Sequence, residues 1–137
     1  MACPFFYPVA RFEASPWSVP PRLPLGDAFT GVCRAPGNTS QPDEARLRAL
    51  CNLGYGRHGC EQFPEGSASD AIRFHVAKDA GALINIQYVF EKNCWPGEHG
   101  NIDYHLTSGF STSLANETLL RQAQTFLESY LRRRSEA

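Results

Sequence analysis

The chain has 137 residues, with thirteen basic and fourteen acidic side chains and a formal net charge of -1. This length is typical of one ordinary domain, so we expect a single domain over residues 1–137. The balanced charge argues against nucleic acid or an anionic membrane as a partner. No apolar run approaches the roughly 20 residues that span a bilayer, and residues 1–8 lack the basic and apolar regions of an export signal. We therefore expect a cytoplasmic protein.

Residues 1–41 contain seven prolines and six aromatic residues. Proline removes backbone donors, so little regular structure is expected here. The aromatic residues are nevertheless too many for a disordered tail. We therefore expect an irregular segment that is ordered by a cross-link through Cys3 and Cys33.

A short helix is predicted next, with Ser40 as its N-cap, Pro42 in its first turn and Cys51 at its end. Cys51 shares a helix face with Leu47 and Leu50 by the i, i+3, i+4 rule, so it points with the core-facing leucines. A glycine-rich turn then brings Cys60 back toward the other cysteines. Residues 1–66 thus form a predicted four-cysteine, metal-binding or cluster-binding half.

Residues 67–137 are predicted to form a βββα half. Apolar residues alternate from Ala71 to Val76, and the run from Leu83 to Phe90 is rich in β-branched and aromatic residues, which indicates a β-hairpin. A turn at Pro96-Gly97 and a third strand around Ile102 follow. A helix is predicted from a cap among residues 113–116 to the arginines at 132–134, which complement the helix dipole. The expected fold is α+β: an irregular half with one short helix, then a three-stranded antiparallel meander and a C-terminal helix.

Cysteine is the residue type that points to chemistry. Five cysteines in a chain without an export signal are expected to be reduced, because disulfides are rare in the cytosol, and reduced thiols that cluster indicate a metal. The spacing of Cys3, Cys33, Cys51 and Cys60 is C-x29-C-x17-C-x8-C. Four thiolates suit either a tetrahedral zinc ion or a [4Fe-4S] cluster. Structural zinc sites usually use tight C-x2-4-C knuckles, which are absent here, so the dispersed spacing favours the cluster over zinc.

Other interpretations of the cysteines stay open. The four thiols could be plain buried side chains or could form a disulfide. Cys94 and His58 are candidates for additional ligands, because thiolate and imidazole both bind such metals. The simpler alternatives are a small buried side chain at a turn for Cys94 and an exposed loop residue for His58.

The first 64 residues also carry a resemblance. The arrangement Cys3-Pro4-Phe5-Phe6, then Cys33, then Cys51, then Cys60-Glu61-Gln62-Phe63-Pro64 resembles a four-cysteine module of uncharacterised bacterial proteins. That module begins with CP and an aromatic residue and ends in C-x-x-aromatic or CP-x-aromatic. It often has proline after its last cysteine, whereas Glu61 follows Cys60 here. The resemblance implies metal or cofactor binding at the four cysteines.

These observations predict a small [4Fe-4S] protein that acts in electron transfer or as a structural accessory subunit and has a protein partner. The alternative is a zinc-stapled interaction module without catalytic activity. A third hypothesis is a thiol enzyme that uses Cys94 or Cys60 with a nearby histidine. The nucleophile-elbow, dinucleotide-binding and P-loop motifs are all missing from the sequence, so an enzyme is the less favoured class. The sequence carries no signal for an oligomeric state.

Overall fold

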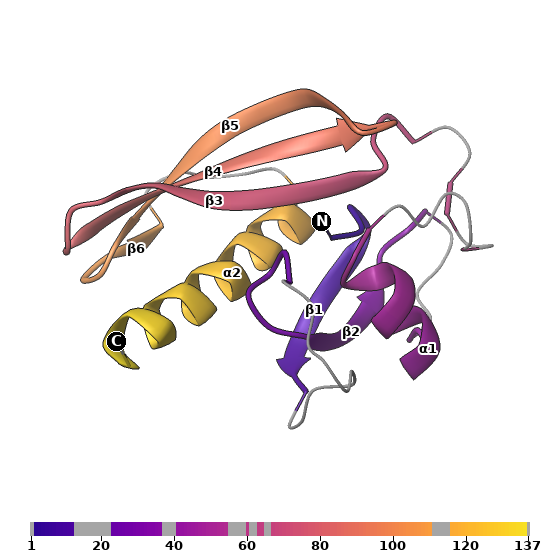
Figure 1. Ribbon diagram of the computed structural model, residues 1–137, viewed down its shortest axis with the longest axis horizontal. Coiled ribbons are helices and arrows are strands. Elements are labelled where there is room, and N and C mark those ends of the chain that lie inside the picture. The colour runs from indigo at the N-terminus through magenta and orange to yellow at the C-terminus, as the bar shows by residue number, and fades with distance from the viewer. Residues whose placement is uncertain are drawn as a thin grey trace.

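The computed structural model describes residues 2–12, 23–36, 41–54, 60, 63–64, 67–110 and 116–136. Two antiparallel sheets and a long C-terminal helix dominate this part of the chain (Figure 1). The smaller sheet pairs β1 (Phe6–Arg11) with β2 (Phe29–Cys33). The larger sheet has the order β3 (Ala71–Asp79), β4 (Leu83–Lys92), β5 (Trp95–His105) and β6 (Gly109–Phe110). Helix α2 (Glu117–Glu136) packs against both sheets.

The predicted fold, an irregular N-terminal half followed by a three-stranded meander, is therefore wrong. A fourth strand, β6, pairs with Tyr104 and His105, and the proline-rich segment forms a sheet of its own. Pro8 lies within β1 opposite Gly31, and the register shifts between Pro8 and Ala10. Both strands of a two-stranded sheet are edges, and proline is tolerated at edges and at bulges. The proline count therefore did not exclude strands here.

The short helix differs from its prediction in its start and in its winding. Asp43 is the N-cap, because its carboxylate accepts the Arg46 N–H at 2.8 Å, and the predicted cap Ser40 lies outside the described residues. One α-helical turn, α1 (Glu44–Arg46), continues into η1 (Leu47–Cys51), which has the wider winding of a π-helix. The Asn52 N–H accordingly donates to the Leu47 carbonyl, five residues back, at 3.1 Å. Single π-helical turns are frequent at functional sites.

The turn between the second and third strands of the large sheet lies before the predicted position. Lys92 pairs with Trp95, and the two residues between them, Asn93 and Cys94, have φ of 51° and 65°. Two positive φ angles are what a tight hairpin turn requires, and asparagine accepts them readily. Pro96 and Gly97 lie inside β5 instead of forming the turn. Proline is accommodated because β6 pairs with the other end of β5 only, which leaves this end as an edge.

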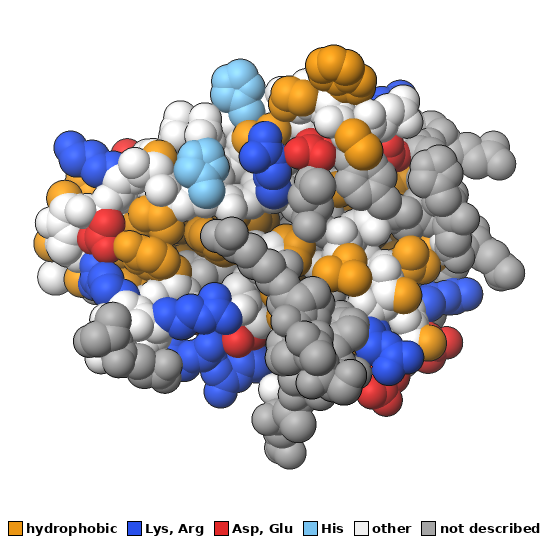
Figure 2. Space-filling model, viewed as in Figure 1, with side chains coloured by type: hydrophobic (Ala, Val, Ile, Leu, Met, Phe, Trp, Pro, Cys, Tyr) orange, Lys and Arg blue, Asp and Glu red, His pale blue; other side chains and the backbone are white. Residues whose placement is uncertain are grey.

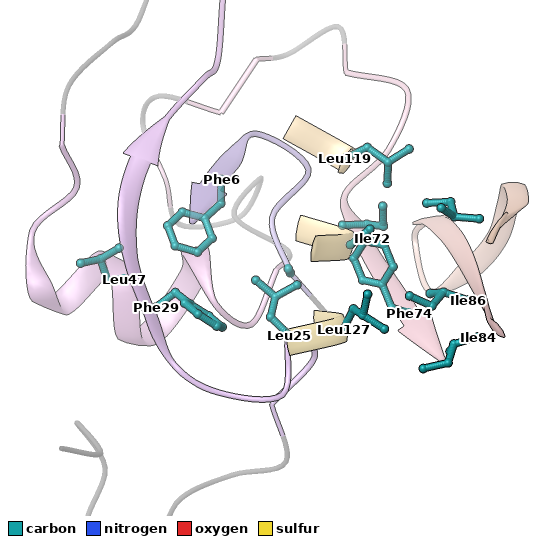
Figure 3. Close-up of a cluster of buried hydrophobic side chains, with 13 residues drawn as sticks. Phe6, Leu25, Phe29, Leu47, Ile72, Phe74, Ile84, Ile86, Leu119 and Leu127 are labelled. Atoms are coloured by element: carbon teal, nitrogen blue, oxygen red, sulfur yellow. The ribbon is translucent and has the colours of Figure 1, made fainter. Parts of the chain in front are cut away.

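Helix α2 is the element that joins the two sheets. Its predicted start is confirmed, because Asn116 caps it by accepting the Leu119 N–H at 3.0 Å. One side buries Leu119, Ala123 and Leu127, and Phe126 stacks on Phe74 of β3 with ring centroids 5.7 Å apart. Figure 3 shows that the labelled core side chains come from both sheets, from the Leu47 turn and from α2. No helix in the described part of the chain is both long and apolar enough to cross a membrane.

The last turns of α2 are held by two carboxylates from other elements. Asp27 accepts hydrogen bonds from the Ser129 hydroxyl at 2.7 Å and from Arg132 at 2.6 Å. Asp79, at the end of β3, accepts from the Tyr130 hydroxyl at 2.6 Å and from Arg134 at 2.9 Å. Basic side chains gather over this end of the helix (Figure 2). The arginines therefore form specific ion pairs as well as complementing the helix dipole.

Candidate metal centre

Four cysteines that are far apart in the sequence line one small pocket. Cys3 precedes β1, Cys33 ends β2, Cys51 ends η1, and Cys60 lies in the segment that follows. The open space at the centre is about 20 Å³, which is room for about one water molecule. The other described residues that line the pocket are Phe5, Phe6, Ala35, Pro42, Arg46, Leu50 and Phe63.

Backbone contacts fix the elements that carry these cysteines. The Cys3 N–H donates to the Cys51 carbonyl at 3.1 Å, and Phe6 is the strand partner of Cys33. The Phe63 N–H closes a turn onto the Cys60 carbonyl at 3.2 Å. The pocket is therefore built by main-chain pairing and not by the side chains alone.

Aromatic rings form part of the pocket wall, which includes Phe5, Phe6 and Phe63. The Phe5 ring meets the Phe63 ring edge to face, with centroids 5.5 Å apart. Such pairs add a geometric preference to the burial of apolar area. This contact ties the Cys3 turn to the Cys60 turn across the pocket.

The electrostatics of the pocket couple the four thiols to one another. Burial, together with the charges of Cys33 and Cys60, raises the pKa of Cys3 to about 12 against the opposing effect of the Phe5 and Phe6 N–H groups. Burial, together with the charges of the other three cysteines, likewise raises the pKa of Cys51 to about 12, against the opposing charge of Arg46. Without a cation in the pocket, Cys3 and Cys51 therefore stay protonated near neutral pH. A bound metal would supply the positive charge that stabilises their thiolates.

The donor set fits thiolate-seeking metals, but its arrangement is not that of ligands around one ion. Cysteine sulfur is the preferred ligand of zinc and of iron-sulfur clusters. Within the described ranges, however, no group of three or more His, Cys, Asp or Glu side chains is arranged to hold a single metal ion. The four cysteines nevertheless share the wall of one pocket.

Of the two additional candidates, Cys94 is described by the structure and does not line this pocket. Cys94 lies exposed in the hairpin turn between β4 and β5 and is not among the described residues that line the pocket. The expectation that Cys94 is a buried side chain at a turn is therefore correct about the turn and wrong about burial. His58 lies outside the described residues.

Asn52, next to Cys51, is a site residue that the sequence reasoning missed. Its buried amide side chain accepts the Phe29 N–H at 3.0 Å and donates to the carbonyls of Phe29 at 3.0 Å and Leu47 at 2.8 Å. It thus pairs with the β2 backbone as a neighbouring strand would. This places the end of η1, and with it Cys51, against the strand that carries Cys33.

Gln122 of α2 supports the pocket from the opposite side and was also missed. Its buried side-chain amide donates to the carbonyl of Cys3 at 2.8 Å and to that of Phe6 at 2.7 Å. Among the buried side-chain polar atoms of the described residues, the Oε1 atom of Gln122 has no hydrogen-bond partner. A polar residue between apolar helix positions was the sequence signal, but a solvent-facing position gives the same pattern.

The resemblance of residues 1–64 to the bacterial four-cysteine module stays a prediction. No protein-family model, no curated protein and no solved structure matches the chain.

Proposed function

We propose that Cys3, Cys33, Cys51 and Cys60 bind a [4Fe-4S] cluster and that the protein acts in electron transfer or as a structural accessory subunit. One observation carries the proposal: four cysteines separated by 29, 17 and 8 residues line the same pocket. A small apolar core needs no such grouping of thiols. Four cysteine ligands are what a [4Fe-4S] cluster requires.

Two details support a cluster over a single ion. The dispersed spacing of the four cysteines lacks the tight C-x2-4-C knuckles that structural zinc sites usually use. The backbone N–H groups of Phe5 and Phe6 lie near enough to the Cys3 thiol to lower its pKa, so they favour its ionised sulfur. Hydrogen bonds to ligand sulfurs are among the means by which proteins set the potential of iron-sulfur clusters. A bound cluster would supply one-electron chemistry at this position.

The depth of the pocket favours electron transfer over a purely structural role. All four cysteines are intermediate in exposure, so the centre lies close to the protein surface. A redox partner could approach such a centre closely, whereas a structural centre is commonly buried. Phe5 and Phe63 shield the pocket without closing it off.

A zinc-stapled interaction module is the second candidate, and two observations favour it. The pocket space of about 20 Å³, room for about one water molecule, suits an ion better than a larger cluster. Trp95 is 76% exposed beside the β4–β5 turn, next to exposed Pro96. Exposed tryptophan is typical of the residues that anchor protein interfaces. On this alternative, zinc would hold the fold and the hairpin would bind the partner.

The deciding experiment is purification without oxygen, followed by a visible spectrum and by iron, sulfide and zinc analysis. For the cluster we expect a brown protein with a broad band at about 400 nm and about four irons per chain. Replacing any one of the four pocket cysteines by serine should remove most of the iron. Cys94→Ser is the matched control, because it removes an exposed thiol outside the pocket and should keep the spectrum of the wild type.

The other outcomes separate the candidates. A colourless protein with about one zinc per chain would overturn the cluster and support the interaction module. A protein without bound metal under both iron and zinc supply would overturn both. Equal loss of iron in Cys94→Ser and in the pocket variants would contradict the assignment of the four ligands.

A further inference from the structure

A second and much larger cleft lies beside the cysteine pocket. Its volume is about 590 Å³, within the range of about 300–1,000 Å³ that small-molecule sites occupy. It lies where the turn before β1, residues 67–69, the β4–β5 end of the large sheet and the first turn of α2 meet, and Figure 1 shows these segments close together. Phe5 lines both the cleft and the cysteine pocket.

The walls of the cleft are suited to an apolar body. Phe5 and Phe90 contribute aromatic surface, and Pro4 and Pro36 add rigid apolar surface. The rings of these wall residues are already rigid, so they lose little conformational entropy when a ligand binds. Such walls favour flat ligands of about the size of one ring.

Among the described residues that line the cleft, the unbalanced charges leave a surplus of one positive charge. Arg34 and Lys92 are the cations, and Glu91 and Glu98 are the carboxylates. Glu91 is mostly buried and forms an ion pair with Arg73 at 2.8 Å, so its charge is already balanced. Two cations therefore face one remaining carboxylate.

The position of the Arg34 guanidinium suits it to bind an anion. Its guanidinium lies over the Tyr7 ring, 4.4 Å from the centroid. Stacking uses the face of the guanidinium, whereas its N–H donors lie in the plane of the group. A stacked arginine thus keeps the fork geometry that binds a carboxylate through two hydrogen bonds.

The first turn of α2 also favours an anion in the cleft. Asn116 and Thr118 line the cleft at the start of this 20-residue helix. The N-terminal end of a helix carries partial positive charge and favours anions. Ser69 supplies a further polar group on the opposite wall.

We propose that this cleft binds a small organic carboxylate with an apolar, ring-sized body. The Arg34 guanidinium and Lys92 would hold the carboxylate, and Phe5 and Phe90 would contact the apolar body. A single surplus positive charge matches a monovalent carboxylate better than a phosphate dianion. None of the described residues that line the cleft is a cysteine, so the site does not rest on the proposed function.

Equilibrium dialysis of the full chain with naphthoate tests the proposal, with uncharged naphthalenemethanol as the comparison ligand. We expect saturable binding of about one naphthoate per chain below about 1 mM, and at least about tenfold weaker binding of the alcohol, as is usual for the loss of a charge-assisted hydrogen bond. Arg34→Gln should weaken naphthoate binding by a similar factor. Lys78→Gln removes a cation from an exposed β3 position outside the cleft and should bind like the wild type.

A steric variant tests the location without changing charge. Gly97 lines the cleft, and a Cβ atom there would lie 3.6 Å from its nearest neighbour, the Phe90 carbonyl, which is an ordinary contact. Gly97→Leu should therefore fold and should block naphthoate, whereas Asn101→Leu, farther along β5 and exposed, should not. Metal content and melting temperature are measured for every variant.

Three results would overturn the proposal. The first is no saturable naphthoate binding by the wild type. The second is equal binding of naphthoate and the alcohol, which would show that no carboxylate is recognised. The third is unchanged naphthoate affinity in both Arg34→Gln and Gly97→Leu with their folds intact, which would place binding elsewhere.

Discussion

Replacing Asn52 by alanine should separate the helix end that carries Cys51 from the strand that carries Cys33. The substitution removes three side-chain hydrogen bonds between buried groups, two of them to the Phe29 backbone. The Leu47 carbonyl keeps a donor, because it also accepts the backbone N–H of residue 52. The Phe29 N–H and carbonyl are the groups that lose their side-chain partner.

The expected loss in the free energy of unfolding follows from the Phe29 N–H and the Phe29 carbonyl. A buried polar group left without its partner costs about 1–3 kcal/mol, so two groups give about 2–6 kcal/mol. A helix end can shift slightly and let water approach, which places the expected loss in the lower half of this range, at about 3 kcal/mol. That is a large share of the roughly 5–15 kcal/mol by which a typical domain is stable.

The assay is urea denaturation followed by circular dichroism, with the metal content of each protein held the same. Asn101→Ala is the control, because Asn101 is exposed on β5, and its substitution should change the free energy of unfolding by less than about 0.5 kcal/mol. A loss below about 1 kcal/mol for Asn52→Ala would refute the reasoning. It would mean that the Phe29 backbone is satisfied without the Asn52 side chain.

Three further predictions concern other contacts of the fold. Gly31→Ala should destabilise the protein by at least about 1–3 kcal/mol in the same urea assay, because the new Cβ would lie 2.1 Å from the Tyr7 carbonyl oxygen, whereas Gly97→Ala should be mild. Gln122→Leu should cost about 1–3 kcal/mol by leaving the Phe6 carbonyl without its side-chain donor, whereas the Cys3 carbonyl still accepts the Phe6 N–H; a stability equal to the wild type would contradict this role. Hydrogen bonds from the Tyr130 hydroxyl, the Gly81 N–H and Arg134 lower the pKa of Asp79 from 3.8 to about 2. The ionised Asp79 carboxylate therefore stabilises the native state above about pH 4, and this contribution is lost as the pH falls toward 2. Asp79→Asn should therefore reduce the change in urea midpoint between pH 4 and pH 2. The same change in the variant and the wild type would exclude Asp79 as a source of this pH dependence.

The sequence predicted the elements with strong periodicity and missed those held by long-range contacts. The alternation after Ala71 and the helical spacing after Asn116 predicted β3 and α2 correctly, because each pattern reflects a face that is buried within one element. The β1–β2 sheet gave no such signal, because Pro8 and a register shift interrupt its alternation. Strand β6 is only two residues long, which is too short for periodicity to be seen.

The grouping of the four cysteines could be predicted from the sequence, whereas the residues that support them could not. Cysteine has few roles when it is reduced, so four thiols in such a chain predict a shared site, and metal binding there stays a prediction. The supporting residues Asn52 and Gln122 act through backbone groups that are distant in the sequence, at Phe29 and Cys3. Amide side chains occur at many positions for many reasons, so neither could be distinguished from a surface residue by sequence alone.

The contacts of α2 with the start of the chain also set an order of events during synthesis. Gln122 donates to the Cys3 and Phe6 carbonyls, and Arg121 donates to the Pro8 carbonyl at 2.7 Å, across separations of 113 to 119 residues. These carbonyls have no α2 partner until that helix has left the ribosome. The turn that carries Cys3 therefore reaches its final position late, so an emerging chain would present its thiols to the solvent before the pocket can close around any cofactor.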